Sequence, residues 1–148
     1  MGILDDLEVR DARGVPVRFG ELFAQGRWVL LWFYPKAKSP GCSAQGRGYA
    51  RRIEEFKELG VEVFGVSHDS ARAQCSFLEQ LAWEGRMIPD RQGLLARRLG
   101  VRRWLGFHRR DTVLLNPQGA IEQVWRSVNP WRDPEVVLSY LRERCQKS

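Results

Sequence analysis

Cysteine and histidine are scarce in this chain of 148 residues, which has three cysteines and two histidines. Cys42, Cys75 and Cys145 are odd in number and distant in sequence from one another and from both histidines. An odd set without a secretory signal argues against a secreted disulfide framework, and the spacings match no zinc motif. We therefore expect no metal, haem or flavin cofactor. His68 and His108 are expected at the surface or in turns.

Long apolar runs are also missing, since no stretch approaches the roughly 20 residues that a membrane-spanning helix needs. The first six residues (MGILDD) carry acids where a signal peptide would carry basic residues. We therefore expect a cytoplasmic protein that does not enter a membrane. No repeat or linker interrupts the chain, and its 43% hydrophobic and 28% charged residues suit one globular domain over residues 1–148.

Lysine is rare beside arginine, with four lysines against twenty arginines, and the formal net charge is +6. Such a charge can indicate a nucleic-acid surface. Here the basic residues are dispersed among acidic and apolar ones, which favours a solvated surface, and we expect no nucleic-acid partner. The least favoured alternative is a binding module in which Trp104, Phe107 and nearby arginines contact bases and phosphates.

Apolar patterning predicts strands that alternate with helices. The expected elements, in order, are strand 28–34, helix 42–58, strand 61–66, helix 69–83, a hairpin of strands 111–115 and 121–125, and helix 133–145. Asp69 or Ser70 is the expected N-cap of the second helix, and Asp133, followed by Pro134, that of the last. The order predicts the α/β class, with a mixed central sheet flanked by helices, and it fits the thioredoxin-like fold.

Cys42 follows the point where a buried strand has ended and a helix begins. The unpaired N–H groups and the positive end of that helix favour the thiolate form of a cysteine. A structural cysteine is expected on an apolar stripe, whereas Cys42 follows Pro40 and Gly41 in a polar turn. The sequence therefore predicts a reactive thiol at this position.

Residues 33–43 (FYPKAKSPGCS) resemble the peroxidatic loop of the peroxiredoxins, above all of the bacterioferritin comigratory protein or PrxQ branch. That branch has Tyr-Pro-Lys, two variable residues, and Thr-Pro-Gly-Cys-Thr. Ser39 and Ser43 stand here in place of the two threonines. Residues 64–70 and 110–116 are similar to two further motifs of the branch, and the resemblance covers nearly the whole chain.

The resemblance implies a thiol peroxidase, in which Cys42 attacks hydrogen peroxide or an organic hydroperoxide and becomes a sulfenic acid. It assigns polarisation of the peroxide to the Ser39 hydroxyl and the Cys42 N–H, and shielding of the thiolate to Pro35. Serine lacks the methyl group that restricts threonine rotamers, so we expect Ser39 to be less preorganised.

The resemblance also implies a fixed cation beside the thiolate. Two neighbouring arginines, Arg109 and Arg110, are candidates for it. The motif leaves one residue between its arginine and its threonine, and only Arg110 has that spacing to Thr112. Arg110 is therefore the predicted catalytic cation.

Reduction of the sulfenic acid is left open by the sequence. Many PrxQ proteins have a resolving cysteine five residues after the peroxidatic one, but here that residue is Arg47. Cys75 is the first candidate for a resolving thiol, but it also fits an apolar stripe on its helix, with Ala71, Leu78 and Ala82. Cys145 continues an apolar stripe of the last helix and is expected to pack there, with an intersubunit disulfide as the open alternative. If neither resolves, thioredoxin, glutaredoxin or a small thiol reduces Cys42 directly.

An alternative enzymatic hypothesis is a disulfide oxidoreductase on the same fold. That chemistry uses Cys-x-x-Cys, whereas Ser39 lies three residues before Cys42 and Gln45 three residues after it. The second thiol is missing on both sides, so the peroxidase hypothesis is favoured. Since PrxQ-like proteins are often monomers, the resemblance implies a monomer.

Overall fold

The computed structural model describes residues 2–104 and 107–146, without the side chains of residues 104, 145 and 146. The strands are β1 (Glu8–Arg10), β2 (Pro16–Arg18), β3 (Trp28–Phe33), β4 (Val61–Ser67), β5 (Arg86–Pro89), β6 (Arg103–Trp104), β7 (Phe107–His108), β8 (Thr112–Leu115) and β9 (Ile121–Trp125). The helices are α1 (Phe19–Ala24), α2 (Pro40–Glu58), α3 (Ala71–Gln80), α4 (Leu94–Leu99) and α5 (Asp133–Gln146).

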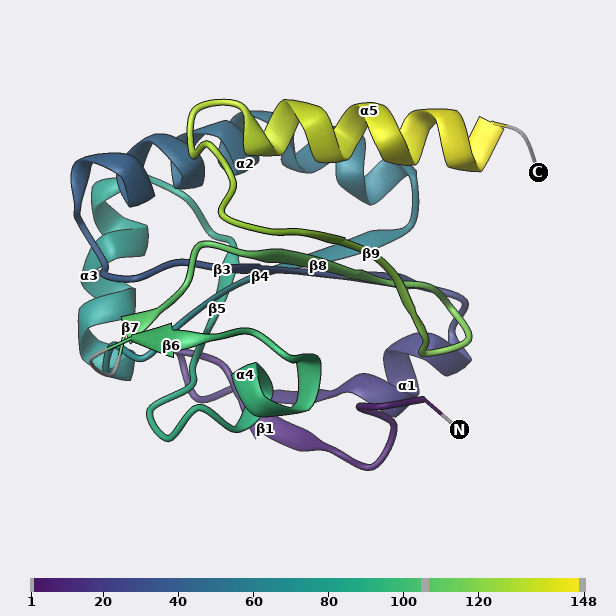
Figure 1. Cartoon of the computed structure of the whole chain (residues 1–148), viewed down its shortest axis with the longest axis horizontal. Helices are drawn as coiled ribbons and strands as arrows, with labels where there is room; N and C mark the ends of the chain where they lie inside the picture. Colours follow the sequence, from purple (N-terminus) through teal and green to yellow (C-terminus); the bar gives the residue numbers. More distant parts are fainter. Residues whose placement is uncertain (1, 105–106, 147–148) are drawn as a thin grey trace.

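A five-stranded sheet in the order β5-β4-β3-β8-β9 forms the centre of the molecule. Strands β3, β4 and β5 are parallel, while β8 and β9 are antiparallel to their neighbours. Helices α2 and α5 cover one face, and α1 and α4 lie on the other (Figure 1). The predicted α/β class, mixed sheet and thioredoxin-like fold are confirmed.

The core has two parts, one on each face of the sheet. Tyr49 and Phe56 of α2 pack on one face with Leu141 of α5, and Phe19 and Leu95 pack on the other. Strand β3 contributes to both parts because successive side chains point to opposite faces. Its continuous apolar sequence is therefore explained by burial on both sides.

Helix α2 begins at Pro40, two residues earlier than expected, with Ser39 as its N-cap residue in an extended conformation. Proline suits this first helical position because it has no N–H and its φ is already helical. The N-cap prediction for α3 is confirmed, since the Ser70 side chain accepts a hydrogen bond from the Ala73 N–H.

The stripe predicted for α3 is confirmed at Leu78 and Cys75, which pack on the core, and is wrong at Ala71 and Ala82. Its buried residues are Gln74, Phe77 and Leu78, whereas Ala71 and Ala82 are exposed. The helix ends at Gln80, and Ala82 lies beyond it with a φ of 49°. The small alanines fitted the helical spacing, but the larger Phe77 determines which face is buried.

Candidate active site

Cys42 is the third residue of α2, the helix that follows β3 after the connection 34–39. Its side chain is fully buried and belongs to the core on the α2 side of the sheet. The N–H groups of this first turn have no partner within the helix, and the positive end of the helix favours an anion. The Cys42 thiol therefore lies at the positive end of a helix and is shielded from bulk water.

Arg110 contacts Cys42. Its Nη1 atom lies 3.4 Å from the Cys42 Sγ and 3.0 Å from the Gln45 Oε1, to which it donates a hydrogen bond. The contact arises because β8 runs antiparallel to β3, which brings the residues just before β8 to the end of β3. Arg109 is exposed. The structure therefore brings Arg110, and not its neighbour, to the thiol.

Steric crowding at this contact explains why residue 41 is a glycine. A Cβ atom on Gly41 would lie 3.1 Å from the Arg110 Nη2 and 3.3 Å from the Pro130 Cγ. Both distances are tighter than ordinary packing. The glycine before Cys42 therefore lets the guanidinium approach the first turn of α2.

Gln45 and Asp133 are two residues that the sequence reasoning did not place in the site. Gln45 donates from Nε2 to the Asp133 Oδ2 over 2.9 Å, and the hydroxyls of Tyr49 and Thr112 donate to the same oxygen. Asp133 was predicted to be an N-cap, and this prediction is wrong: its carboxylate binds three side chains. An acid at a helix start fits an N-cap on local sequence, and only the contact with α2 distinguishes the two roles.

Burial raises the pKa of Asp133, and the hydrogen bonds from Tyr49, Gln45 and Thr112 oppose that effect without cancelling it. The pKa of Tyr49 is also raised, first by burial and then by the neighbouring Asp133 charge. Within the described residues, the second carboxylate oxygen of Asp133, Oδ1, has no hydrogen-bond partner. The site therefore contains a buried carboxylate that is only partly compensated.

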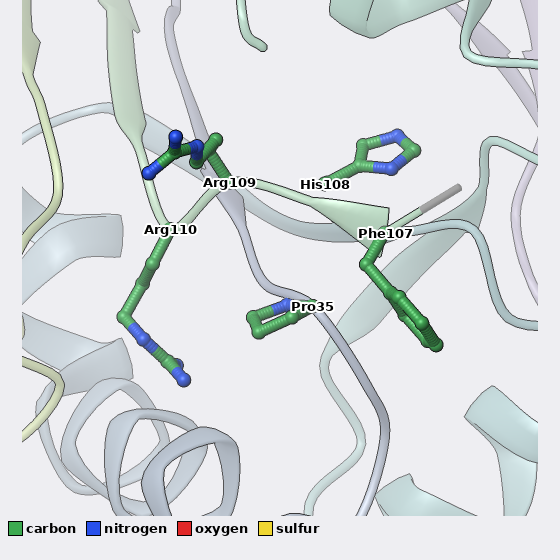
Figure 2. A pocket seen from close by; sticks show the side chains of 5 residues that line it. All are labelled: Pro35, Phe107, His108, Arg109 and Arg110. Carbon is green, nitrogen blue, oxygen red and sulfur yellow. The ribbon is translucent and has the colours of Figure 1, made fainter. Parts of the chain in front are cut away.

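Pro35 and Arg110 line a pocket of about 420 Å³ together with Phe107, His108 and Arg109. Figure 2 shows the side chains of Phe107 and Arg110 on the side of Pro35, whereas His108 and Arg109 point the other way. A regular strand would alternate from one residue to the next, so the backbone departs from that pattern at Arg109 and Arg110, beyond the end of β7. The pocket thus joins an apolar wall to the guanidinium that contacts Cys42.

Ser39 is half-buried, and its hydroxyl donates to the Lys36 carbonyl oxygen over 3.0 Å. It makes no side-chain cap to α2. A serine hydroxyl can rotate and has two acceptor lone pairs as well as its proton. Ser39 therefore lies next to the first turn of α2 with its proton directed at its own loop.

Cys75 is half-buried on α3, and its thiol donates to the Ala12 carbonyl oxygen over 3.2 Å. Contact between α3 and the first turn of α2 is made further along, where the Gln80 Nε2 lies 3.4 Å from the Ser43 Oγ. Cys42 and Cys75 are both free thiols. A disulfide between them requires Cys42 to leave Arg110 and Cys75 to leave Ala12. The side chain of Cys145 lies outside the described residues.

His108 is buried, contrary to the expectation of a surface position. Its Nε2 atom lies 2.8 Å from the Asp90 Oδ2. In the part of the chain that the structure describes, no cluster of three or more His, Cys, Asp or Glu side chains could hold a metal ion. The same residues include no helix long and apolar enough to span a bilayer.

The fold and the cysteine in the first turn of α2 define a thioredoxin-like protein. Its helix lacks the second cysteine of a Cys-x-x-Cys motif. The AhpC/TSA family profile matches residues 3–124. The chain is 32% identical to Peroxiredoxin Bcp of Escherichia coli over 129 residues, which are 82% of each protein. It is 29% identical to Peroxiredoxin Bcp of Xanthomonas campestris over 130 residues, 82% of this chain and 81% of that protein.

Solved structures agree with these matches. The bacterioferritin comigratory protein of Xanthomonas campestris, studied for alkyl peroxide reduction, superposes with a TM-score of 0.87 at 26% identity over 96% of this chain and 94% of that one. BcpB of Mycobacterium tuberculosis superposes with a TM-score of 0.84 at 29% identity, covering 93% and 92%. The chain therefore belongs to the AhpC/TSA family, as a peroxiredoxin of the Bcp or PrxQ type. The resemblance stated from the sequence is confirmed.

Proposed function

We propose that Cys42 is the peroxidatic residue of this thiol peroxidase. The Cys42 thiolate attacks one oxygen of the hydroperoxide, a sulfur–oxygen bond forms and the O–O bond breaks. The leaving oxygen takes up a proton and departs as water or an alcohol, and Cys42 becomes a sulfenic acid. The observation that carries this proposal is the contact of Arg110 with the Cys42 Sγ at the start of α2.

Each neighbouring residue has a proposed part in this step. Arg110 is a fixed cation that stabilises the thiolate and then the charge that develops on the oxygens. The Cys42 N–H and the Ser39 hydroxyl hold the peroxide in line with the sulfur, for which Ser39 turns away from Lys36. Pro35 shields the thiolate from water at the wall of the pocket.

The proposed substrates are hydrogen peroxide and small organic hydroperoxides. The relative from Xanthomonas campestris was studied for alkyl peroxide reduction. In this chain, Pro35 and Phe107 give the pocket an apolar wall beside Arg110. An alkyl group resting on that wall would leave its peroxide oxygens toward the guanidinium.

Two routes for reducing the sulfenic acid remain as proposals. In the first, the Cys75 sulfur attacks the Cys42 sulfur after both helices rearrange, the S–O bond breaks, water leaves and a disulfide forms, which thioredoxin or glutaredoxin then reduces. Alternatively, an external thiol attacks Cys42 directly. Residues 1–148 would act as one monomeric peroxiredoxin domain in the cytoplasm, without a nucleic-acid partner.

Intact mass of the fully reduced protein after one equivalent of hydrogen peroxide tests the proposal directly. Cys42→Ser and Cys75→Ser variants are measured beside it. Loss of two hydrogens that requires both thiols establishes the Cys75 route, whereas gain of one oxygen on Cys42 alone establishes an external reductant. If the mass at Cys42 does not change rapidly, the peroxidatic role is refuted. Rapid reduction of insulin by the chain would favour the disulfide oxidoreductase instead.

A further inference from the structure

A continuous set of hydrogen bonds links Cys42 to the start of α5. Arg110 contacts the Cys42 Sγ and the Gln45 Oε1 through the same nitrogen, Nη1. The other end of the Gln45 amide donates to Asp133. Gln45 and Asp133 are both buried, so the bond between them is shielded from water, whereas Arg110 is half-buried.

The charge of Asp133 determines which way the Gln45 amide points. An ionised carboxylate can only accept hydrogen bonds, so it has to take the NH₂ end of the amide. The carbonyl end then faces away from Asp133, toward Arg110. Arginine is a donor only, so the reversed amide would set its NH₂ group against the guanidinium. The orientation therefore follows from Asp133 on one side and Arg110 on the other.

The ionised form of Asp133 is supported by its surroundings. Three donors, from Gln45, Tyr49 and Thr112, converge on Oδ2. Arg110 is the cation that acts on Asp133 from beside β8, and Tyr49 is the titratable group that faces it from α2. Three convergent donors suit an anion, because hydrogen bonds to a charged acceptor are roughly twice as strong as neutral ones.

The carboxylate of Asp133 is incompletely satisfied by the described residues. A simple N-cap would satisfy backbone N–H groups at the surface, whereas Asp133 is buried and leaves Oδ1 without a partner among the described residues. A buried polar atom without a partner is unfavourable. The position of this carboxylate, two hydrogen bonds from the guanidinium on the thiol, gives it a role beyond helix capping.

We propose that Asp133 is a positioning residue for Arg110: it fixes the Gln45 amide, which in turn holds the guanidinium against Cys42. This inference rests on the proposed function of Cys42. It adds Asp133 and Gln45 to the residues that determine the reaction rate, although neither touches the peroxide.

The test uses the full chain with Cys75→Ser and Cys145→Ser, so that only Cys42 reacts. The rate of its oxidation by hydrogen peroxide and its thiolate absorbance at neutral pH are measured for Asp133→Ala, Gln45→Leu and the double variant. Asp90→Asn is the matched control, because it alters another buried carboxylate, one that binds α4 on the opposite face of the sheet.

Asp133→Ala and Gln45→Leu are each expected to slow oxidation about tenfold and to lower the thiolate fraction. The double variant is expected to be no more than about twofold slower than either, since both act through one contact. Asp90→Asn is expected to lose stability and keep its rate. Should Asp133→Ala not fold, Asp133→Asn replaces it, with a smaller expected loss of about threefold because a neutral oxygen still accepts.

Independent losses that multiply in the double variant would overturn the proposal, as would an unchanged rate and thiolate fraction in a folded Asp133 variant. Failure of the parent chain to react at Cys42 is a different result. It would refute the peroxidatic role itself, so the two failures are distinguishable.

Discussion

Two buried carboxylates, Asp90 and Asp133, lie on opposite faces of the same sheet and have opposite pKa shifts. Burial by itself would raise the pKa of Asp90, but hydrogen bonds from His108 and from the N–H groups of Leu95 and Ala96 outweigh it and lower the pKa. At Asp133 burial prevails and the pKa is raised.

The two aspartates differ in how hydrogen bonds are distributed over their carboxylate oxygens. Both oxygens of Asp90 have partners, the Leu95 N–H on one and the Ala96 N–H and His108 on the other. At Asp133 all three donors share one oxygen. The first arrangement is a structural clamp between α4 and β7. The second leaves the Asp133 Oδ1 without a partner among the described residues, and Gln45 and Arg110 link it to Cys42.

One short segment supplies partners to both carboxylates. His108 binds Asp90 on one face, and Arg110 reaches Gln45 and Cys42 on the other. Residues two apart in an extended chain normally share a face, so the bend between β7 and β8 is what separates them. A stability site and the proposed catalytic site are therefore joined by this bend, and variants on either side distinguish the two.

The largest expected effect is that of Arg110→Leu. Loss of the cation beside the Cys42 Sγ should slow oxidation by hydrogen peroxide about a hundredfold or more, measured by rapid-mixing fluorescence. Arg97→Leu, on the exposed side of α4 near Asp90, is the matched control and should leave the rate unchanged. Equal losses in the two variants would mean that only overall charge matters.

Asp90→Asn should reduce the free energy of unfolding at neutral pH by about 2 kcal/mol, because a charged, fully used acceptor is lost. A lowered pKa stabilises the fold above the unfolded pKa, and this contribution is lost as the pH falls through the folded pKa. The difference from wild type should therefore shrink in acid. Urea unfolding across pH measures it, and a constant difference would show that His108 and the N–H groups do not favour the anion.

Asp133→Asn should change the free energy of unfolding less than Asp90→Asn does, and the change should depend on pH in the opposite direction. Its raised pKa means that the folded state binds a proton more tightly than the unfolded state does. Wild-type stability should fall as the pH rises from the unfolded pKa through the folded one, and the variant should lack this fall. Parallel urea titrations of the two proteins check the sign. A wild-type stability that instead rises more steeply than the variant's over that range contradicts it.

Ser39→Thr should have the smallest effect, an increase in the rate with hydrogen peroxide of about two- to threefold. The added methyl group restricts the hydroxyl to fewer rotamers without changing any charge. Stopped-flow oxidation of Cys42 in both proteins measures it. A variant that reacts no faster would show that rotamer freedom at Ser39 does not limit the reaction.

The sequence by itself determined the fold class, the order of the main strands and helices, and the thiol motif around Cys42. These follow from local properties: the apolar run of β3, the helical spacing in α2 and α5, and the proline and glycine before Cys42. Short elements such as β1, β5 and α4 were not predicted, because three to six residues carry too little periodicity.

Only the tertiary structure decided that His108 is buried against Asp90 and that Asp133 binds Gln45 instead of capping α5. It also places Arg110, the arginine that the motif spacing had indicated, against Cys42. Each of these contacts joins residues far apart in the chain, and the sheet order brings them together. A polar residue at a helix start or in a loop has the same local sequence whether its partner is the backbone, water or a distant side chain. Its role is set by the packing of β3, β8 and α2, which no local pattern contains.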